Sequence, residues 1–210
     1  MIELVTTDGV FRLDGGEWEV TNNIWLVGDD REVLVIDAAH DAAPIVDAVN
    51  GRRVVGIALT HGHNDHINAA VALQDAVDAP ILLHPDDTMF WHDVYPDREP
   101  DAALADGLAL VTGGDELGVL HTPGHSPGGC CFVLGSGGHV FSGDTLFCGG
   151  PGATGRSHSD YPLILQSIRT RLLTLPAETI VHTGHGDSTT VGAETSLIGD
   201  LIREVEEGRA

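Results

Sequence analysis

Four side chains that commonly bind metal ions fall within six residues of one another. They lie in the segment His61-Gly62-His63-Asn64-Asp65-His66, which follows an apolar run at residues 54–60 that reads as a buried strand. A loop can direct alternate side chains to one point, and zinc requires such convergence because Zn–N bonds are only about 2.0–2.1 Å long. The spacing therefore predicts a metal site at the end of this strand.

Three further candidate ligands lie at the ends of other expected strands, beside glycine: His125, Asp144 and His185. Any one of them could be an ordinary core residue, but the combined set favours a metal centre. The remaining histidines are expected at the surface, in turns or supporting the ligands: His40, His84, His92, His121, His139, His158 and His182. Asp37, at the end of another buried strand, could orient a ligand histidine or serve a turn.

These motifs resemble the metallo-β-lactamase superfamily and, within it, the glyoxalase II-like (hydroxyacylglutathione hydrolase-like) thioesterases. The resemblance rests on four segments in this order: residues 60–66, 121–128, 142–147 and 183–186. It implies an α+β fold, the αββα four-layer sandwich, in a short form with a single domain over residues 1–210.

The resemblance also implies two divalent metal ions, with zinc expected and iron as the alternative. The first ion would be held by His61, His63 and His125. The second would be held by Asp65, His66 and His185. Asp144 would bridge the two, and Asp65 and Asp144 would be the catalytic carboxylates. A metal-bridging hydroxide suits thioester hydrolysis, because a thiolate leaves without a general acid.

Single residues distinguish this chain from relatives with other activities. Flavodiiron proteins carry a glutamate where this chain has His63, and lactonases of the superfamily place a tyrosine where it has Phe147. Lactamases with a cysteine at the bridging site disagree with Asp144. Persulfide dioxygenases keep the same ligand types but bind one iron, and they stay an alternative. A catalytically silent metal-binding protein is the third interpretation.

The charge balance limits the classes of molecule that the protein could bind. The chain has 32 acidic and 10 basic residues, a net charge of −22 and a pI near 4.5, so nucleic acid and anionic membranes are poor partners. All the basic residues are arginines, which excludes Schiff-base and P-loop lysines. Without a signal peptide or an apolar run of about 18 residues, we expect a cytoplasmic protein. A small thiol ester is the expected partner.

Two features bear on the substrate and on redox chemistry. Arg156 ends a glycine-rich loop at residues 147–156 and could bind a carboxylate of the thiol carrier, as a substrate-side arginine does in related short forms. An ordinary surface salt bridge is the competing interpretation. The thiol could be glutathione, mycothiol or another small thiol. Cys130, Cys131 and Cys148 lack CxxC spacing, and we assign them no catalytic role.

The elements that must position these residues follow from periodicity and turn signals. Strands are expected at residues 23–27, 33–36, 54–60, 81–84, 117–120, 130–134, 139–141 and 179–182. Helices are expected at residues 41–50, from about 67 to 79, and at 162–173 and 194–206. Residues 85–114 are expected to form a short helix and a loop that acts as a lid or insertion shaping the pocket. The pattern predicts two packed sheets with helices outside.

Overall fold

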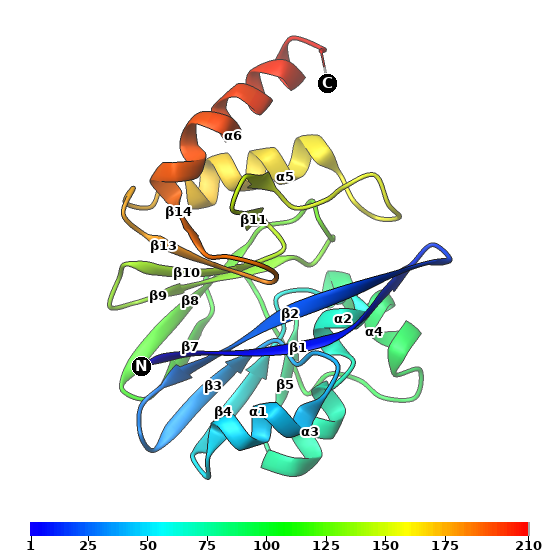
Figure 1. Ribbon diagram of the computed structural model, residues 1–210, viewed down its shortest axis with the longest axis vertical. Coiled ribbons are helices and arrows are strands. Elements are labelled where there is room, and N and C mark those ends of the chain that lie inside the picture. The colour runs from blue at the N-terminus through cyan, green and yellow to red at the C-terminus, as the bar shows by residue number, and fades with distance from the viewer. Residues whose placement is uncertain (210) are drawn as a thin grey trace.

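The computed structural model describes residues 1–209, and in it two six-stranded sheets pack face to face (Figure 1). The first sheet has the order β1 (Ile2–Leu13), β2 (Gly16–Gly28), β3 (Glu32–Ile36), β4 (Arg53–Ala58), β5 (Ile81–Leu83) and β6 (Ala102–Ala103). The second has the order β14 (Thr189–Thr190), β13 (Ile180–Thr183), β10 (His139–Gly143), β9 (Cys130–Leu134), β8 (Asp115–His121) and β7 (Ala109–Thr112). A separate ribbon pairs β11 (Leu146–Phe147) with β12 (Gly150–Pro151).

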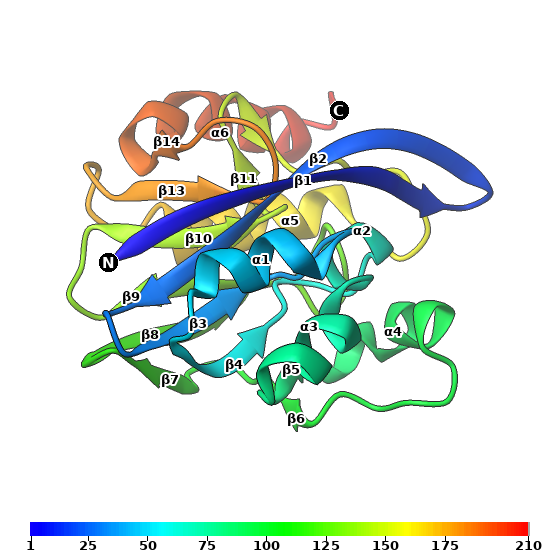
Figure 2. The ribbon, with the colours of Figure 1, turned by 60° about the horizontal axis from the view of Figure 1, so that its bottom comes forward.

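Helices cover the outer faces of both sheets, which gives the four expected αββα layers (Figure 2). On the side of the first sheet lie α1 (Ala42–Val49), α2 (Asn64–Ile67), α3 (Ala70–Val77), the 3₁₀ turn η1 (Pro85–Asp87) and α4 (Thr88–Val94). On the side of the second lie α5 (Tyr161–Ser167), the π-helical turn η2 (Ile168–Leu172) and α6 (Val191–Glu206). Among residues 1–209, no helix is both long and apolar enough to span a bilayer.

Three buried clusters hold the layers together. Alternate residues of a strand face opposite sides of its sheet, so Ile24 packs toward the helices while Trp25 packs between the sheets. The cluster between the sheets includes Trp25, Leu34, Leu117, Phe132 and Phe141. Ile164, Ile168 and Ile198 seal the second sheet from outside. Each such side chain contributes roughly 1.5–3 kcal/mol by leaving water, and together they fix where the strands end.

Local signals for the helices are confirmed with small changes. Asp41 caps α1 by accepting a hydrogen bond of 2.9 Å from the Ala43 N–H, and Asn50 ends that helix in a left-handed conformation. The single helix expected from about residue 67 is instead two helices, α2 and α3. Because of this break, the predicted ligands in the first helix lie in a short element of their own.

Two regions differ from expectation. The first expected strand, at residues 23–27, is the end of the 13-residue β2, which forms a long hairpin with the unexpected β1. The lid expected at residues 85–114 is wrong, because the segment buries Trp91 and Leu104 completely. It also adds β6 to one sheet and β7 to the other. This segment is part of the body of the protein.

Candidate metal centre

All seven sequence-predicted ligands meet where the ends of strands from both sheets converge. Four of them follow β4, in the loop that enters α2 and in that helix itself. The second sheet supplies one ligand after each of three strands: His125 follows β8, Asp144 follows β10 and His185 follows β13. Their ligand atoms form three groups that each lie within 4.8 Å: His61–His63–His125, His61–His66–Asp144 and Asp65–His66–His185.

The ring nitrogens are spaced as ligands of one ion would be. His63 Nδ1 lies 3.1 Å from His61 Nε2 and 3.0 Å from His125 Nε2. In the other group, His66 Nε2 lies 3.2 Å from His185 Nε2. Tetrahedral bonds of 2.0–2.1 Å place two nitrogen ligands about 3.3 Å apart. The side chains are therefore arranged for metal binding before any ion is considered.

The outer nitrogens of the rings determine which nitrogen faces the centre. His66 Nδ1 lies 2.8 Å from Asp37 Oδ2, and the carbonyl oxygens of Ala153 and Thr21 lie 2.8 Å from Nδ1 of His125 and His185. A carbonyl or carboxylate oxygen only accepts, so each Nδ1 must carry the proton. The Nε2 lone pair of each ring is then free to bind a metal ion.

Asp37 supports histidines of both groups. It accepts directly from His66, and it also accepts from Thr60 Oγ1, at 3.0 and 2.9 Å. Since the Thr60 hydroxyl donates its proton to Asp37, it must accept from His61 Nδ1, 3.1 Å away. Of the two interpretations of Asp37, these contacts favour the first, the orientation of histidines that are predicted ligands.

Two carboxylates lie within the cluster with free lone pairs. Asp144 Oδ1 is 3.4 Å from His66 Nε2, and Asp144 Oδ2 is 3.6 Å from Nε2 of both His125 and His185, so this side chain lies between the groups. The buried Oδ1 atoms of Asp65 and Asp144 have no hydrogen-bond partner within residues 1–209. Buried acceptors without a partner are costly unless a cation binds them. The donor set therefore fits two divalent ions.

The histidines of the two ligand groups differ in the direction of their pKa shifts. Burial and the neighbouring histidines lower the pKa of His61 and His63, so both are neutral at pH 7. Burial also lowers the pKa of His66, but the carboxylates around it, Asp144 first, outweigh that effect and raise the pKa to about 10. Asp65 keeps a pKa below the usual range despite its burial, because of His66. In this group, metal binding therefore competes with protonation of His66 at Nε2.

Sequence reasoning missed one buried residue that joins two ligand loops. Asp87 accepts from the Gly62 N–H at 2.8 Å, the Gly128 N–H at 2.6 Å and the Ser126 hydroxyl at 2.7 Å. Gly62 separates His61 from His63, and the other two donors follow His125 in the chain. The only signal was an aspartate before an apolar helix, which equally describes an ordinary helix cap.

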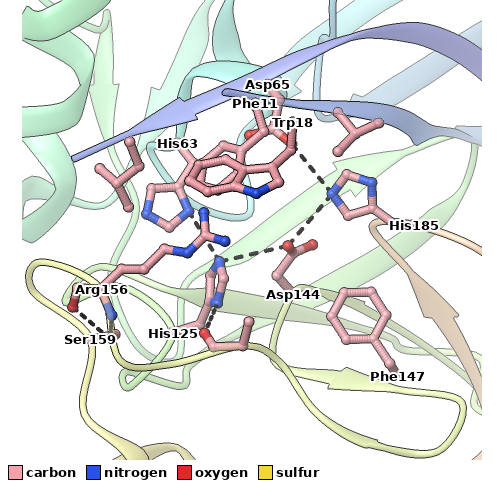
Figure 3. A pocket seen from close by; sticks show the side chains of 13 residues that line it. Phe11, Trp18, His63, Asp65, His125, Asp144, Phe147, Arg156, Ser159 and His185 are labelled. Atoms are coloured by element: carbon pink, nitrogen blue, oxygen red, sulfur yellow. Dashed lines mark hydrogen bonds and ion pairs between the residues drawn. The ribbon is translucent and has the colours of Figure 1, made fainter. Parts of the chain in front are cut away.

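A pocket of about 310 Å³ opens beside the ligands (Figure 3). Five predicted ligands form its floor, and one wall comes from the end of β11 and the segment between β11 and α5: Phe147, Ala153, Arg156 and Ser159. The other wall comes from the β1–β2 hairpin: Phe11, Leu13, Trp18 and Val20. No lining residue comes from the segment 85–114, which again contradicts the lid. Asp14-Gly15 between alternating apolar residues was the missed hairpin signal.

The remaining residues that the sequence singled out lie in different environments. Arg156 forms no ion pair in the part of the chain that the structure describes, so the surface salt bridge is wrong for it. Cys130 and Cys131 are buried, and burial raises the pKa of the Cys131 thiol to about 11. Cys148 is exposed. His182 is only 8% exposed, lies in β13 and stacks on Phe141, so of the positions expected for it the surface and the turn are wrong.

Comparisons with known proteins show the family of this chain. The hydroxyacylglutathione hydrolase GloC of Haemophilus influenzae is 32% identical over 186 residues, covering 81% of this chain and 87% of that protein. The crystal structure of TTHA1623 in a di-iron-bound form is 34% identical with a TM-score of 0.73, covering 84% of this chain and 93% of that one. The structure of the BLEG-1 B3 metallo-beta-lactamase is 30% identical with a TM-score of 0.77, covering 93% and 99%. Because the sequence profile of the metallo-beta-lactamase superfamily also matches residues 18–185, the chain belongs to the metallo-beta-lactamase superfamily.

Proposed function

We propose that this protein is a dinuclear metal hydrolase that cleaves thioesters of a low-molecular-weight thiol, as glyoxalase II-like enzymes do. The observation that carries the proposal is the pair of ligand groups with the Asp144 carboxylate between them, at the floor of an open pocket. The superfamily consists mostly of metal-dependent hydrolases, and a relative with 32% identity is a hydroxyacylglutathione hydrolase, which supports the thioester class.

The proposed ligand sets follow the geometry. His61, His63 and His125 would hold the first ion, and Asp65, His66 and His185 the second. Asp144 would bridge them. We propose zinc in both positions, with iron as the alternative because TTHA1623 is described in a di-iron-bound form.

The residues of the site would have different roles in hydrolysis. Two divalent ions in these positions would lower the pKa of water and polarise the thioester carbonyl. Asp144 places a carboxylate between the groups and so offsets their paired positive charge. Asp65 Oδ2 accepts from Asn22 Nδ2 at 3.2 Å, which leaves the unpartnered Oδ1 to bind metal or accept a proton. The thiolate then leaves without a protein acid.

The test is metal content followed by a substrate panel. Protein expressed without metal supplementation is analysed by inductively coupled plasma mass spectrometry, and thiol release is followed for glutathione and mycothiol thioesters. Two metal ions per chain and thioester turnover are the expected results. One iron per chain with oxygen uptake on persulfides would instead indicate sulfur oxygenation. Turnover of a chromogenic cephalosporin without thioester cleavage would indicate a lactamase.

A further inference from the structure

His40 lies in a strained turn, one side chain away from the second ligand group. Its backbone is left-handed, with a φ of 59°, a conformation that residues other than glycine rarely adopt. Thr7 in β1 holds the turn by donating to the Ala39 carbonyl at 2.9 Å. Asn68, at the break between α2 and α3, accepts from the His40 N–H at 2.5 Å. A strained residue that its surroundings fix in this way is a candidate for a functional role.

The hydrogen bonds around His40 run in one direction. Because Asn68 Oδ1 accepts from a backbone N–H, it is Asn68 Nδ2 that faces His40 Nδ1, 3.2 Å away, and an amide nitrogen only donates. His40 Nδ1 therefore accepts, and the proton of the ring is on Nε2, which donates to Asn22 Oδ1 at 2.8 Å. Burial lowers the pKa of His40, so the ring is neutral at pH 7, as this arrangement requires.

Asn22 continues this direction to a predicted ligand. Its Oδ1 is engaged by His40, so the amide nitrogen faces the metal centre and lies 3.2 Å from Asp65 Oδ2. The same nitrogen is 3.2 and 3.4 Å from Nε2 of His66 and His185, the other members of the second group. An amide NH₂ cannot bind a cation, so this fully buried side chain is a donor to the group and not a member of it.

The ring of His40 fits because Gly9 in β1 has no side chain. A Cβ atom at Gly9 would lie 2.1 Å from His40 Nδ1, which is far too close for two unbonded atoms. Gly9 pairs with Val20 in the regular ladder of the β1–β2 hairpin. This strand therefore uses a glycine for close approach of the His40 ring and not for an unusual backbone conformation.

We infer that His40 and Asn22 form a positioning pair that fixes the Asp65 carboxylate, with Oδ2 held by Asn22 and Oδ1 presented to the second metal ion. This inference rests on the proposed function and its ligand sets. Asp65 Oδ1 is buried and has no hydrogen-bond partner within residues 1–209. Residues that orient a ligand in advance strengthen metal binding.

The effect of the positioning pair should be confined to the second ion. Within the described part of the chain, neither side chain of the pair has a hydrogen bond to the first ligand group, His61, His63 and His125. Loss of the pair should therefore weaken one ion and leave the other in place. A general loss of stability would instead weaken both.

Two variants at His40 separate hydrogen bonding from shape. Met and Gln have similar length, and neither favours the left-handed conformation, but only Gln can both accept from Asn68 and donate to Asn22. His40→Met should weaken zinc binding by the second group about 10-fold, whereas His40→Gln should stay within about threefold of the wild type. Zinc binding by the first group should change less than about twofold in both variants.

A third variant displaces the ring without changing its hydrogen-bonding groups. Gly9→Ala places a methyl group where the His40 ring lies, so it should also weaken the second group about 10-fold. The matched control is Gly118→Ala in β8, where the new Cβ would lie 4.0 Å from the Val133 carbonyl oxygen, an ordinary contact. This control should leave zinc binding by both groups unchanged.

NMR spectroscopy follows each group separately. The Nδ1–H groups of His125 and His185 donate to backbone carbonyls, so their ¹H–¹⁵N signals report on the first and the second group during zinc titration against a competing chelator. In the metal-free wild type, the ¹⁵N shifts of His40 should show a neutral ring protonated at Nε2. A ring protonated at Nδ1, equal losses in both groups of His40→Met, or equal losses in His40→Met and His40→Gln would overturn the positioning pair.

These measurements do not depend on catalysis. A selective loss at the second group in a protein that cleaves no thioester supports the positioning pair, and the proposed function is then wrong. Thioester turnover together with unchanged zinc binding in His40→Met and Gly9→Ala leaves the hydrolase standing and removes the positioning pair.

Discussion

Histidines lie side by side in two different ways in this molecule. In the first ligand group the rings of His61, His63 and His125 meet at 80–84°, and His66 meets His185 at 85°. Away from the centre, His84 and His121 stack at 11°, and His139 and His182 stack at 12°. We call these two the stacked pairs.

The difference teaches how to recognise a metal ligand. The lone pair of an imidazole nitrogen lies in the plane of its ring. Two crossed rings share a line on which one ion can lie in both planes, whereas stacked rings have parallel planes that do not meet. His84, Asp86 and His121 do bring ligand atoms within 4.8 Å, but the stacking prevents both rings from binding one ion. A criterion based only on the distance between ligand atoms would therefore predict metal sites that the orientation of the rings does not allow.

The largest expected effect comes from removing a crossed ring. His125→Ala should reduce metal content by about one ion per chain and lower thioester turnover by more than 100-fold, because even residues that merely support a ligand contribute about 10- to 100-fold. The matched control is His121→Gln, four residues earlier, where the amide can still donate to the Pro127 carbonyl. Metal analysis and kinetics check both variants. Equal metal loss in the two would remove the distinction between crossed and stacked rings.

An intermediate effect is expected from the residue that joins the two ligand loops. Asp87→Asn replaces one acceptor oxygen by an NH₂ group, which then faces either the Gly62 or the Gly128 N–H donor. The first ligand group should bind zinc about 10-fold more weakly, while the second, anchored by Asp37, should change little. Competition with a fluorescent chelator measures both affinities. The adjacent, exposed Asp86→Asn is the control, and unchanged zinc affinity in Asp87→Asn would reduce Asp87 to a purely structural role.

The sequence predicted what depends on local spacing. The αββα fold is confirmed, and the seven predicted ligands do converge, because each follows a buried strand whose end the core fixes. The assignment of individual ligands to individual ions stays a prediction. Asp87 escaped notice because its partners Ser126 and Gly128 lie 39 and 41 residues away in the chain. Contacts at such separations leave no periodic signal.

The pocket wall was missed for a related reason. The pairing of Asp14 with Ser157 spans 143 residues, and the stacking of Arg156 on Trp18 likewise joins two distant parts of the chain. Nothing in residues 147–160 indicates a partner near the N-terminus. Only the Asp14-Gly15 turn signal was available, and it predicts a hairpin without showing what its aromatic face contacts.

The smallest expected effect concerns a stacked pair and appears in stability alone. Burial and the neighbouring His139 lower the pKa of His182 to about 4, whereas an unfolded histidine titrates near 6.5. The unfolded chain therefore binds this proton first as the pH falls below 6.5, and native stability is lost between 6.5 and about 4.

His182→Phe keeps a ring on Phe141 but cannot titrate. Between pH 7 and 4.5 the wild type should lose about 2 kcal/mol more unfolding free energy than the variant. Urea denaturation of both proteins in chelator measures the difference, and the titrating groups that do not contact His182 cancel between them. Metal content at pH 7 should be the same in both, because His182 belongs to none of the groups of close ligand atoms found within residues 1–209. A metal deficit in His182→Phe would contradict the geometric distinction itself, whereas identical pH dependence would show that His182 is protonated as easily in the fold as in the unfolded chain.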